Sequence, residues 1–193
     1  MKKEDLRSIK TKKSIKESFI ELVEIKGYNK VSVSDIVNKA QINRNTFYLH
    51  YQDKEDLAKK ILADVSENMN VALGTYVYTT KSSMAKITET EIRWGFRNLL
   101  NLIEPEIELY RIILLDESLN GYINKTFNMI KKHIAYLLDI KNPRSNLIYE
   151  YAFSGMIGVI QQWIIYSPNS ASKTAMFLAK LAYSNLQQFK TIN

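Results

Sequence analysis

The sequence predicts an all-α fold of about nine helices, and three observations support this. The 193 residues include only 6 glycines and 3 prolines, so turn signals are sparse. Apolar residues recur at helical spacing over long stretches. The chain has no cysteine, which excludes a disulfide framework and a thiolate metal site.

The composition is that of an ordinary soluble protein, with 46% hydrophobic and 24% charged residues. Residues 1–15 are charged and lack the apolar core of a secretory signal. The longest apolar run, Ala152–Tyr166, is shorter than the ~20 apolar residues that a membrane helix needs. We therefore expect a cytoplasmic protein.

A first helix is predicted over Lys3–Lys26, because Ile15, Phe19, Leu22 and Val23 form an apolar stripe at helical spacing. Gly27 follows directly. Glycine at this position is typical of a helix end, since it adopts left-handed backbone angles without strain.

Two short helices follow. Ser32 and Asp35 have the spacing of a capping box, which predicts a second helix over 33–40. Residues 40–42 leave room only for a tight turn. Asn43 is a good N-cap for a third helix over 44–51, with Phe47 and Tyr51 as its buried anchors.

Asp53 is the expected N-cap of a fourth helix that runs from Lys54 to about Tyr78, with Leu57, Ile61, Val65 and either Met69 or Val71 facing inward. The remaining pattern predicts helices near 85–103, 105–116, 118–139, 145–167 and 170–190. Prolines and polar clusters separate them.

Two short helices joined by a tight turn, next to a longer helix, indicate a helix-turn-helix. Residues 1–60 hold 14 Lys and Arg against 9 Asp and Glu, whereas the whole chain has a net charge of +7. This concentration of positive charge favours a nucleic acid or an acidic membrane as partner. A solvated lysine face that maintains solubility explains the charge equally well.

The segment VSVSDIVNKAQINRNTFYLHYQDKEDL, residues 31–57, resembles the DNA-binding signature of TetR-family transcriptional regulators. The later YAFSGMIGVIQQWIIYSP, residues 151–168, is similar to a Trp-containing helix of one TetR subgroup. The resemblance implies a three-helix DNA-binding domain over 1–53 and a helical ligand-binding and dimerisation domain over 54–193. Gln41 stands where the family usually has glycine, and a non-glycine residue at left-handed angles costs roughly 1 kcal/mol. Asn45 stands where the family usually has a small residue.

The third helix carries the expected base contacts. Arg44 suits the O6/N7 edge of guanine and Asn45 the N6/N7 edge of adenine, with Thr46 beside them. By resemblance, Tyr48, His50 and Lys54 contact phosphates, and Ser32 serves the second helix first and a phosphate second. Solvated polar residues are the alternative for each. Lys10, Lys12 and Lys13 are either a DNA-contacting arm or a solvated charge run.

The sequence offers no group of catalytic residues. His133 is the only histidine besides His50, so no His-based metal site is expected, and no glycine-rich phosphate loop is present. We therefore expect neither an enzyme nor a bound cofactor or metal.

The C-terminal part is rich in large apolar side chains. Core packing explains most of them, but the resemblance implies a cavity for a small, largely apolar effector. Candidate lining residues are Met69, Trp94, Tyr110, Phe127, Phe153, Met156 and Trp163. The resemblance also implies that the helices near 145–167 and 170–190 form a homodimer interface.

Together these features predict a repressor that an effector releases from a palindromic DNA operator. The alternative is a TetR-like co-activator that acts through protein contacts and has no operator of its own. Gln41 and Asn45 motivate this alternative because they depart from the usual pattern.

Overall fold

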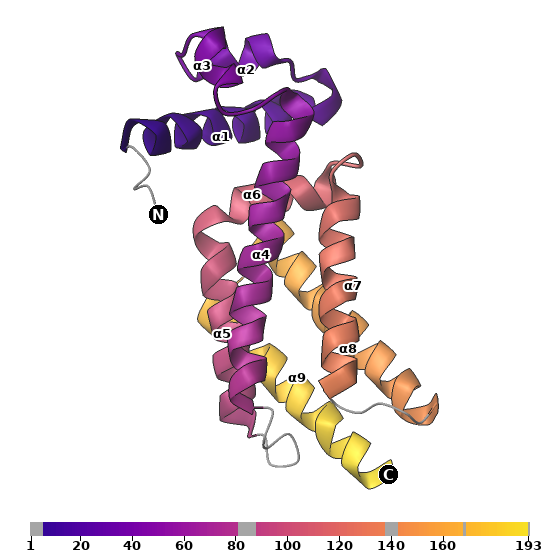
Figure 1. Ribbon diagram of the computed structural model, residues 1–193. Coiled ribbons are helices and arrows are strands. Elements are labelled where there is room, and N and C mark those ends of the chain that lie inside the picture. Colours follow the sequence, from indigo (N-terminus) through magenta and orange to yellow (C-terminus); the bar gives the residue numbers. More distant parts are fainter. Residues whose placement is uncertain (1–5, 81–87, 138–142, 168, 193) are drawn as a thin grey trace. The chain divides into compact units, whose positions relative to one another are not determined.

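The computed structural model describes residues 6–80, 88–137, 143–167 and 169–192. Within these ranges the secondary structure consists of α-helices α1–α9 and two short 3-10 helices, without strands (Figure 1). The predicted all-α fold is confirmed. None of the described helices combines the length and apolar character needed to cross a membrane.

The chain divides into two compact units. The first contains the described residues up to Val65 together with Ile112–Ile123, and the second contains the other described residues. The boundary drawn from the sequence between residues 53 and 54 divides the chain by function, and it remains a prediction. The packing assigns the start of the fourth helix and the segment around residue 116 to the first unit.

The first unit begins with α1 (Leu6–Lys26), η1 (Tyr28–Lys30), α2 (Val33–Lys39) and α3 (Arg44–Tyr48), followed by the start of α4 (Lys54–Thr80). Figure 1 shows α2 and α3 side by side above the long α1. Its core is formed by apolar side chains that are 0–6% exposed: Ile15, Phe19, Val23, Ile36, Val37, Phe47, Leu57 and Ile61. The predicted apolar stripes thus form one shared core.

Gly27 ends α1 as predicted. Its φ of 77° lies in the left-handed region, which glycine adopts without strain. Its N–H donates to the Val23 carbonyl at 2.8 Å, which closes the last turn of the helix. The chain then turns directly into η1.

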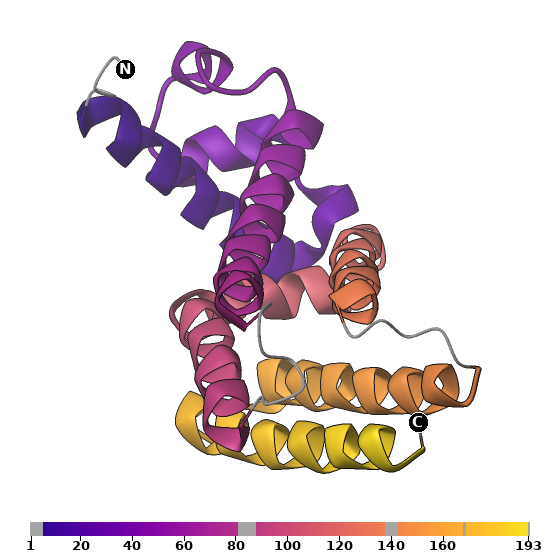
Figure 2. The same cartoon turned by 60° about the horizontal axis from the view of Figure 1, so that its bottom comes forward.

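The second unit contains the remainder of α4, α5 (Glu89–Ile103), η3 (Glu104–Glu106), most of α6 (Ile107–Leu115) and α7 (Asn120–Leu137), α8 (Pro143–Tyr166) and α9 (Ala171–Ile192). Figure 2 shows α8 and α9 side by side, and α9 also packs on α5. Ala179 and Ala182 of α9 meet Ile92 of α5 in a buried cluster. These small residues let the helices approach closely, because they place only a methyl group between the two backbones.

Most helix boundaries agree with the predicted ones to within a few residues. The third helix is shorter than expected, since α3 ends at Tyr48 rather than at residue 51. In α4, Leu57, Ile61, Val65 and Met69 are buried, whereas Val71 is 57% exposed. Met69 is therefore the inward-facing residue of that turn.

Candidate DNA-binding surface

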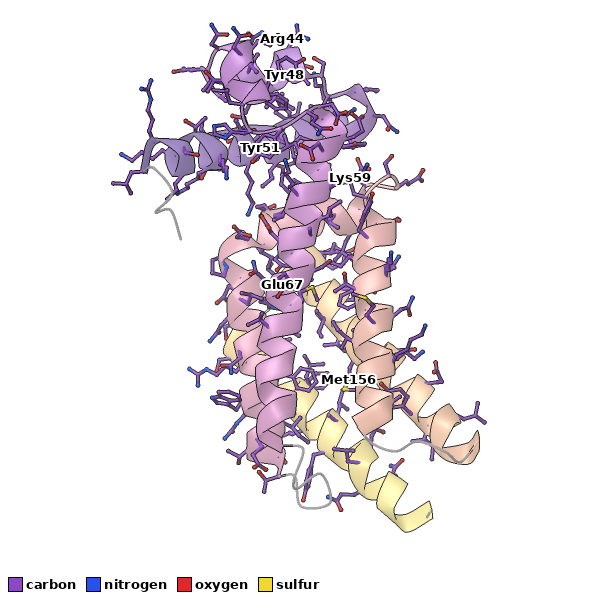
Figure 3. The ribbon with its side chains drawn as sticks, in the orientation of Figure 1. Arg44, Tyr48, Tyr51, Lys59, Glu67 and Met156 are labelled. Atoms are coloured by element: carbon purple, nitrogen blue, oxygen red, sulfur yellow. The ribbon has the colours of Figure 1, made fainter. Side chains whose placement is uncertain are left out.

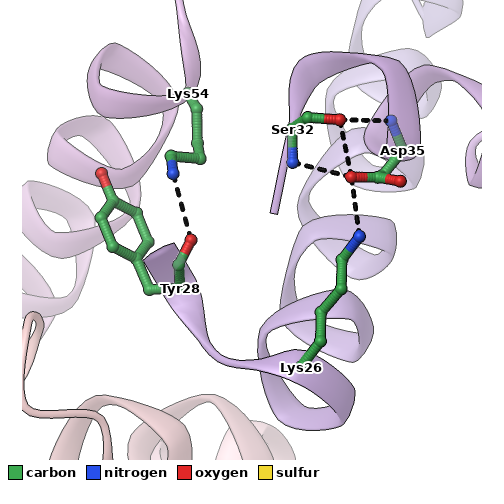
Figure 4. A network of polar contacts seen from close by, with 5 residues as sticks. All are labelled: Lys26, Tyr28, Ser32, Asp35 and Lys54. Atoms are coloured by element: carbon green, nitrogen blue, oxygen red, sulfur yellow. Dashed lines mark hydrogen bonds and ion pairs between the residues drawn. The ribbon is translucent and has the colours of Figure 1, made fainter. Parts of the chain in front are cut away.

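The start of α2 is held by a capping box. The Ser32 hydroxyl accepts from the Asp35 N–H at 3.2 Å, and the Asp35 carboxylate accepts from the Ser32 N–H at 2.8 Å. The same carboxylate accepts from the Ser32 hydroxyl at 2.6 Å and from the Lys26 ammonium at 2.7 Å (Figure 4). These hydrogen bonds, with Lys26 first, hold the pKa of Asp35 well below its usual range.

The turn between α2 and α3 passes through a left-handed residue. Gln41 has φ 54°, which confirms that this non-glycine residue adopts the conformation expected from its place in the motif. Asn43 then caps α3, and its side-chain oxygen accepts from the Asn45 N–H at 2.9 Å. The turn therefore sets where α3 begins.

Aromatic side chains anchor this short helix. Phe47 is fully buried and Tyr51 is 8% exposed, and their ring centroids lie 5.6 Å apart. The Lys60 ammonium lies 5.2 Å from the centroid of the Tyr51 ring. Five helical residues have few backbone hydrogen bonds of their own, so this burial stabilises α3.

The other side of α3 is exposed and polar. The Arg44 guanidinium lies along Tyr48, with Nε and Nη2 each 3.4 Å from the Tyr48 hydroxyl and Cζ 5.8 Å from the ring centroid. Figure 3 shows both side chains on the side of α3 that faces away from α1. Asn45 is exposed next to Arg44, and Thr46 is half-buried. This surface presents hydrogen-bond donors and acceptors of the kinds that contact base edges.

His50 and Lys54 follow α3 in the chain, and both are half-buried. The Lys54 side chain is only 13% exposed. Its ammonium donates to the Tyr28 carbonyl at 3.1 Å and lies 4.3 Å from the centroid of the Tyr28 ring (Figure 4). The sequence reasoning missed this internal role, because residues 28 and 54 lie on different elements.

A second contact with Tyr28 comes from the segment between α6 and α7. One Asp116 carboxylate oxygen accepts from the Tyr28 N–H at 2.9 Å, and the other accepts from the Ser118 N–H at 2.9 Å. Burial, with a contribution from the nearby Glu55, raises the pKa of Tyr28 to about 12, so this phenol stays neutral. No sequence pattern indicated this contact between residues 88 positions apart.

Most residues predicted to line an effector cavity lie in the interior of the second unit. Met69, Tyr110, Phe127, Phe153 and Trp163 are 0–6% exposed. Met156 is half-buried against the cluster between α5 and α9. Trp94 lies apart from this group, because it is 48% exposed.

Two of these aromatics have polar ends with different surroundings. The Trp163 Nε1–H donates to the Asn169 carbonyl at 2.8 Å, so this indole holds the turn between α8 and α9. Burial raises the pKa of Tyr110 to about 12, with a further contribution from Glu106. Tyr110 therefore offers a neutral hydroxyl within an apolar region.

The described residues form an all-α protein with a capped helix-turn-helix and a second helical unit, which is the organisation of a DNA-binding regulator. Two family models match it. The model of bacterial regulatory proteins of the tetR family matches residues 20–61, and a model of a transcriptional regulator C-terminal region matches residues 90–183. The chain belongs to the tetR family of transcriptional regulators.

Relatives match over different shares of their length. The chain is 26% identical to the HTH-type dhaKLM operon transcriptional activator DhaS of Lactococcus lactis over 188 residues, which cover 96% of this chain and 95% of that protein. It is 29% identical to the uncharacterized HTH-type transcriptional regulator YxbF of Bacillus subtilis over 84 residues, which cover 41% of this chain and 22% of that protein.

Solved structures agree in fold. A transcriptional regulator from Aquifex aeolicus has a TM-score of 0.64 at 20% identity and covers 90% of this chain and 98% of its own. The dihydroxyacetone kinase operon activator DhaS has a TM-score of 0.58 at 20% identity and covers 94% of this chain and 97% of its own.

Proposed function

We propose that this regulator binds a palindromic DNA operator as a homodimer and that a small, largely apolar effector lowers its operator affinity. The observation that carries the proposal is the exposed face of α3. Arg44, Asn45 and Tyr48 present polar groups there, while Phe47 and Tyr51 fix the helix from behind. This division into an anchored face and a polar face is what a recognition helix needs.

Each residue has a proposed role. Arg44 and Asn45 contact a guanine and an adenine in the major groove, with Thr46 beside them. Tyr48 and His50 donate to phosphates. Lys54 reaches a phosphate only if its ammonium leaves the Tyr28 carbonyl, to which it donates at 3.1 Å in the structure.

Ser32 is proposed to contact a phosphate through its N-cap position. Its hydroxyl already donates to Asp35 and accepts from the Asp35 N–H. A hydroxyl oxygen offers one donor, so a phosphate contact from this side chain requires the bond to the Asp35 carboxylate to open. We therefore assign Ser32 first to the cap, as the sequence reasoning did.

Homodimerisation is supported by an apolar surface on α8 and α9. Leu147 and Tyr151 of α8 are 72% and 77% exposed, and Phe177 of α9 is 52% exposed. A Cβ atom added at Gly155 or Gly158 would meet nothing within 4 Å. Large exposed apolar groups beside open small residues fit a second copy of the same two helices, which would cover them in a four-helix bundle.

An apolar effector is supported by the character of the second unit. Its interior includes aromatic side chains and Met69 among aliphatic ones, with the Tyr110 hydroxyl as a polar group within them. The effector would act through α4, which contributes Met69 to the second unit and Lys54 to the first. By helical spacing from Met69, Leu73 and Tyr76 are also expected on the ligand side of α4, and their side chains lie outside the described set.

Linkage gives a direct test of this coupling. If the effector weakens operator binding, the operator must weaken effector binding by the same factor. Calorimetry of one candidate effector, titrated into free protein and into the protein–operator complex, is expected to give a lower affinity in the complex. Equal affinities in the two titrations would rule out the coupling.

A second candidate function is activation, with or without an operator of its own. The relative DhaS of Lactococcus lactis is described as a transcriptional activator and matches along nearly its whole length. The internal engagement of Lys54 also removes one expected phosphate donor from the free surface. Transcription in vitro from a template with the operator decides the sign, because a repressor lowers the transcript level and an activator raises it.

Selection of bound DNA from a random pool tests operator binding. We expect an enriched two-fold symmetric sequence with half-sites about one helical turn apart, roughly 34 Å, or a multiple of that distance. A variant with Arg44→Ala and Asn45→Ala keeps the buried anchors and is the matched control, which is expected to enrich nothing. Absence of enrichment by the natural chain at low salt contradicts the proposal and favours the co-activator.

A further inference from the structure

Leu49 directly follows α3 and is the most exposed large apolar side chain in the described residues, at 80%. Its backbone still has helical angles, with φ −68° and ψ −22°. Its N–H donates to the Asn45 carbonyl at 3.1 Å. This is the hydrogen bond of a helical turn, so Leu49 lies one turn after Asn45 on the same side of the helix.

The position of this leucine follows from the anchoring of α3. Phe47 and Tyr51 occupy the buried side, at 0% and 8% exposure. Leu49 lies between them in sequence and is therefore turned away from the core, because successive helical residues are 100° apart. Its neighbours on the outer side are Asn45 and Tyr48, both exposed. The free protein gains nothing from an apolar group there, since water surrounds it.

We propose that Leu49 contacts the C5-methyl group of a thymine in the major groove, next to the base contacted by Asn45. Thymine is the only standard DNA base that presents a methyl group on this edge, and apolar side chains recognise it. The inference rests on the proposed operator binding, and it adds a specificity-determining residue to that surface. Each half-site would then contain an adenine met by Asn45 and an adjacent thymine met by Leu49.

Three other contacts make different predictions. If Leu49 touched only sugar carbons, it would add affinity without preference for thymine. If it met a second protein copy, its replacement would change the oligomeric state rather than base preference. If the methyl group of the half-buried Thr46 met the thymine instead, Thr46→Ser would remove the preference and Leu49→Ala would not.

The test uses the operator obtained by selection, with each thymine replaced in turn by deoxyuridine, which lacks only the C5-methyl group. Binding is followed by fluorescence anisotropy at fixed salt. For the natural chain, we expect one thymine per half-site at which this replacement weakens binding roughly fourfold, the factor that corresponds to about 0.8 kcal/mol for one buried methyl group. For Leu49→Ala, the same replacement is expected to change nothing.

Two variants serve as controls. Ile25→Ala removes a comparably exposed apolar group from α1, at 75% exposure, and is expected to keep the sensitivity to deoxyuridine. Leu49→Met keeps an apolar side chain and is expected to keep it too. Because Leu49 is 80% exposed, Leu49→Ala should remain folded, and its circular dichroism melting curve checks this.

The inference is overturned if no thymine is sensitive, or if Leu49→Ala shows the same sensitivity as the natural chain. It is also overturned if Thr46→Ser alone abolishes the effect. A selected operator without thymine sensitivity rejects the role of Leu49 and leaves operator binding intact. Failure to select any operator rejects the proposed function and the role of Leu49 with it.

Discussion

Replacing Asp116 by alanine tests whether the segment between α6 and α7 stabilises the DNA-binding unit. The Asp116 carboxylate accepts from the Tyr28 N–H and the Ser118 N–H, both at 2.9 Å. Alanine removes both acceptors. The Tyr28 N–H is part-buried and is the main loss, whereas the Ser118 N–H is exposed and can bond to water.

The cost follows from the hydrogen-bond geometry. A buried donor without an acceptor costs about 1–3 kcal/mol. Because water partly reaches the Tyr28 N–H, we expect its cost in the lower part of this range, about 1–2 kcal/mol. The hydrogen bond from Lys54 to the Tyr28 carbonyl weakens as well, because η1 loses its second attachment. A loss of about 1–2 kcal/mol corresponds to roughly 5–30-fold faster exchange of the Tyr28 amide, if that amide exchanges by unfolding of this unit.

Hydrogen exchange and urea unfolding measure these two quantities. Glu117→Ala is the matched control, since it removes an exposed carboxylate from the adjacent position. Asp116→Asn keeps one carbonyl oxygen as acceptor and should fall between the natural chain and Asp116→Ala. The reasoning is refuted if Asp116→Ala exchanges at Tyr28 and unfolds in urea like Glu117→Ala.

Three further predictions concern single contacts. Gln41→Gly should change the free energy of unfolding, measured in urea, by less than about 1 kcal/mol, because relief of left-handed strain offsets the greater freedom of glycine in the unfolded chain. Gln41→Val should lower the free energy of unfolding by about 1 kcal/mol or more in the same measurement. The pKa of Asp35 is lowered in the folded state, chiefly by Lys26, so its contribution to stability is complete above the unfolded value near 3.8 and is lost progressively as the pH falls towards the folded value. Asp35→Asn should therefore lower the melting temperature more at pH 7 than at pH 2, and an equal effect at both pH values contradicts this. Trp163→Phe should lower the free energy of unfolding by about 1–3 kcal/mol, because it removes both the Nε1–H donor to the Asn169 carbonyl and part of the ring volume. An unchanged urea midpoint would show that the indole does not hold the turn between α8 and α9.

Local signals in the sequence predicted the helix-turn-helix well. The capping box of Ser32 and Asp35, the N-cap at Asn43 and the left-handed residue Gln41 all occur where they were expected. Each depends on residues only two or three positions apart, so the physical cause lies within the pattern itself. Asp53 likewise caps α4, accepting from the Asp56 N–H at 2.6 Å.

Contacts between distant elements were not predictable in this way. Tyr28 brings together Lys54 and Asp116, which have no sequence pattern in common with it. A lysine at a helix start suits a phosphate and a backbone carbonyl equally well, because both are hydrogen-bond acceptors. Only the folded arrangement shows which acceptor lies within reach.

Residue type also failed to separate interior from surface in the second unit. Trp94 and Trp163 were both predicted to line a cavity, yet one is 48% exposed and the other 2%. Aromatic side chains suit a core, a cavity or an interface by the same chemistry, so composition does not distinguish these places. The turn after α8 decides the matter for Trp163, since it supplies the carbonyl that the indole needs.

The central claim, that the exposed face of α3 contacts DNA bases, is tested most directly by comparing Arg44→Ala with Lys54→Ala on the selected operator. Anisotropy is measured over a salt series with several base substitutions, after melting curves confirm that both variants are folded. Arg44→Ala should relax preference at one base position, at a cost of roughly 1–3 kcal/mol. If the Lys54 ammonium leaves the Tyr28 carbonyl for a phosphate, Lys54→Ala should weaken binding to every sequence about equally and lower the salt slope by roughly one unit per site. If Arg44→Ala instead weakens all sequences equally, the α3 face does not read bases and the account is contradicted.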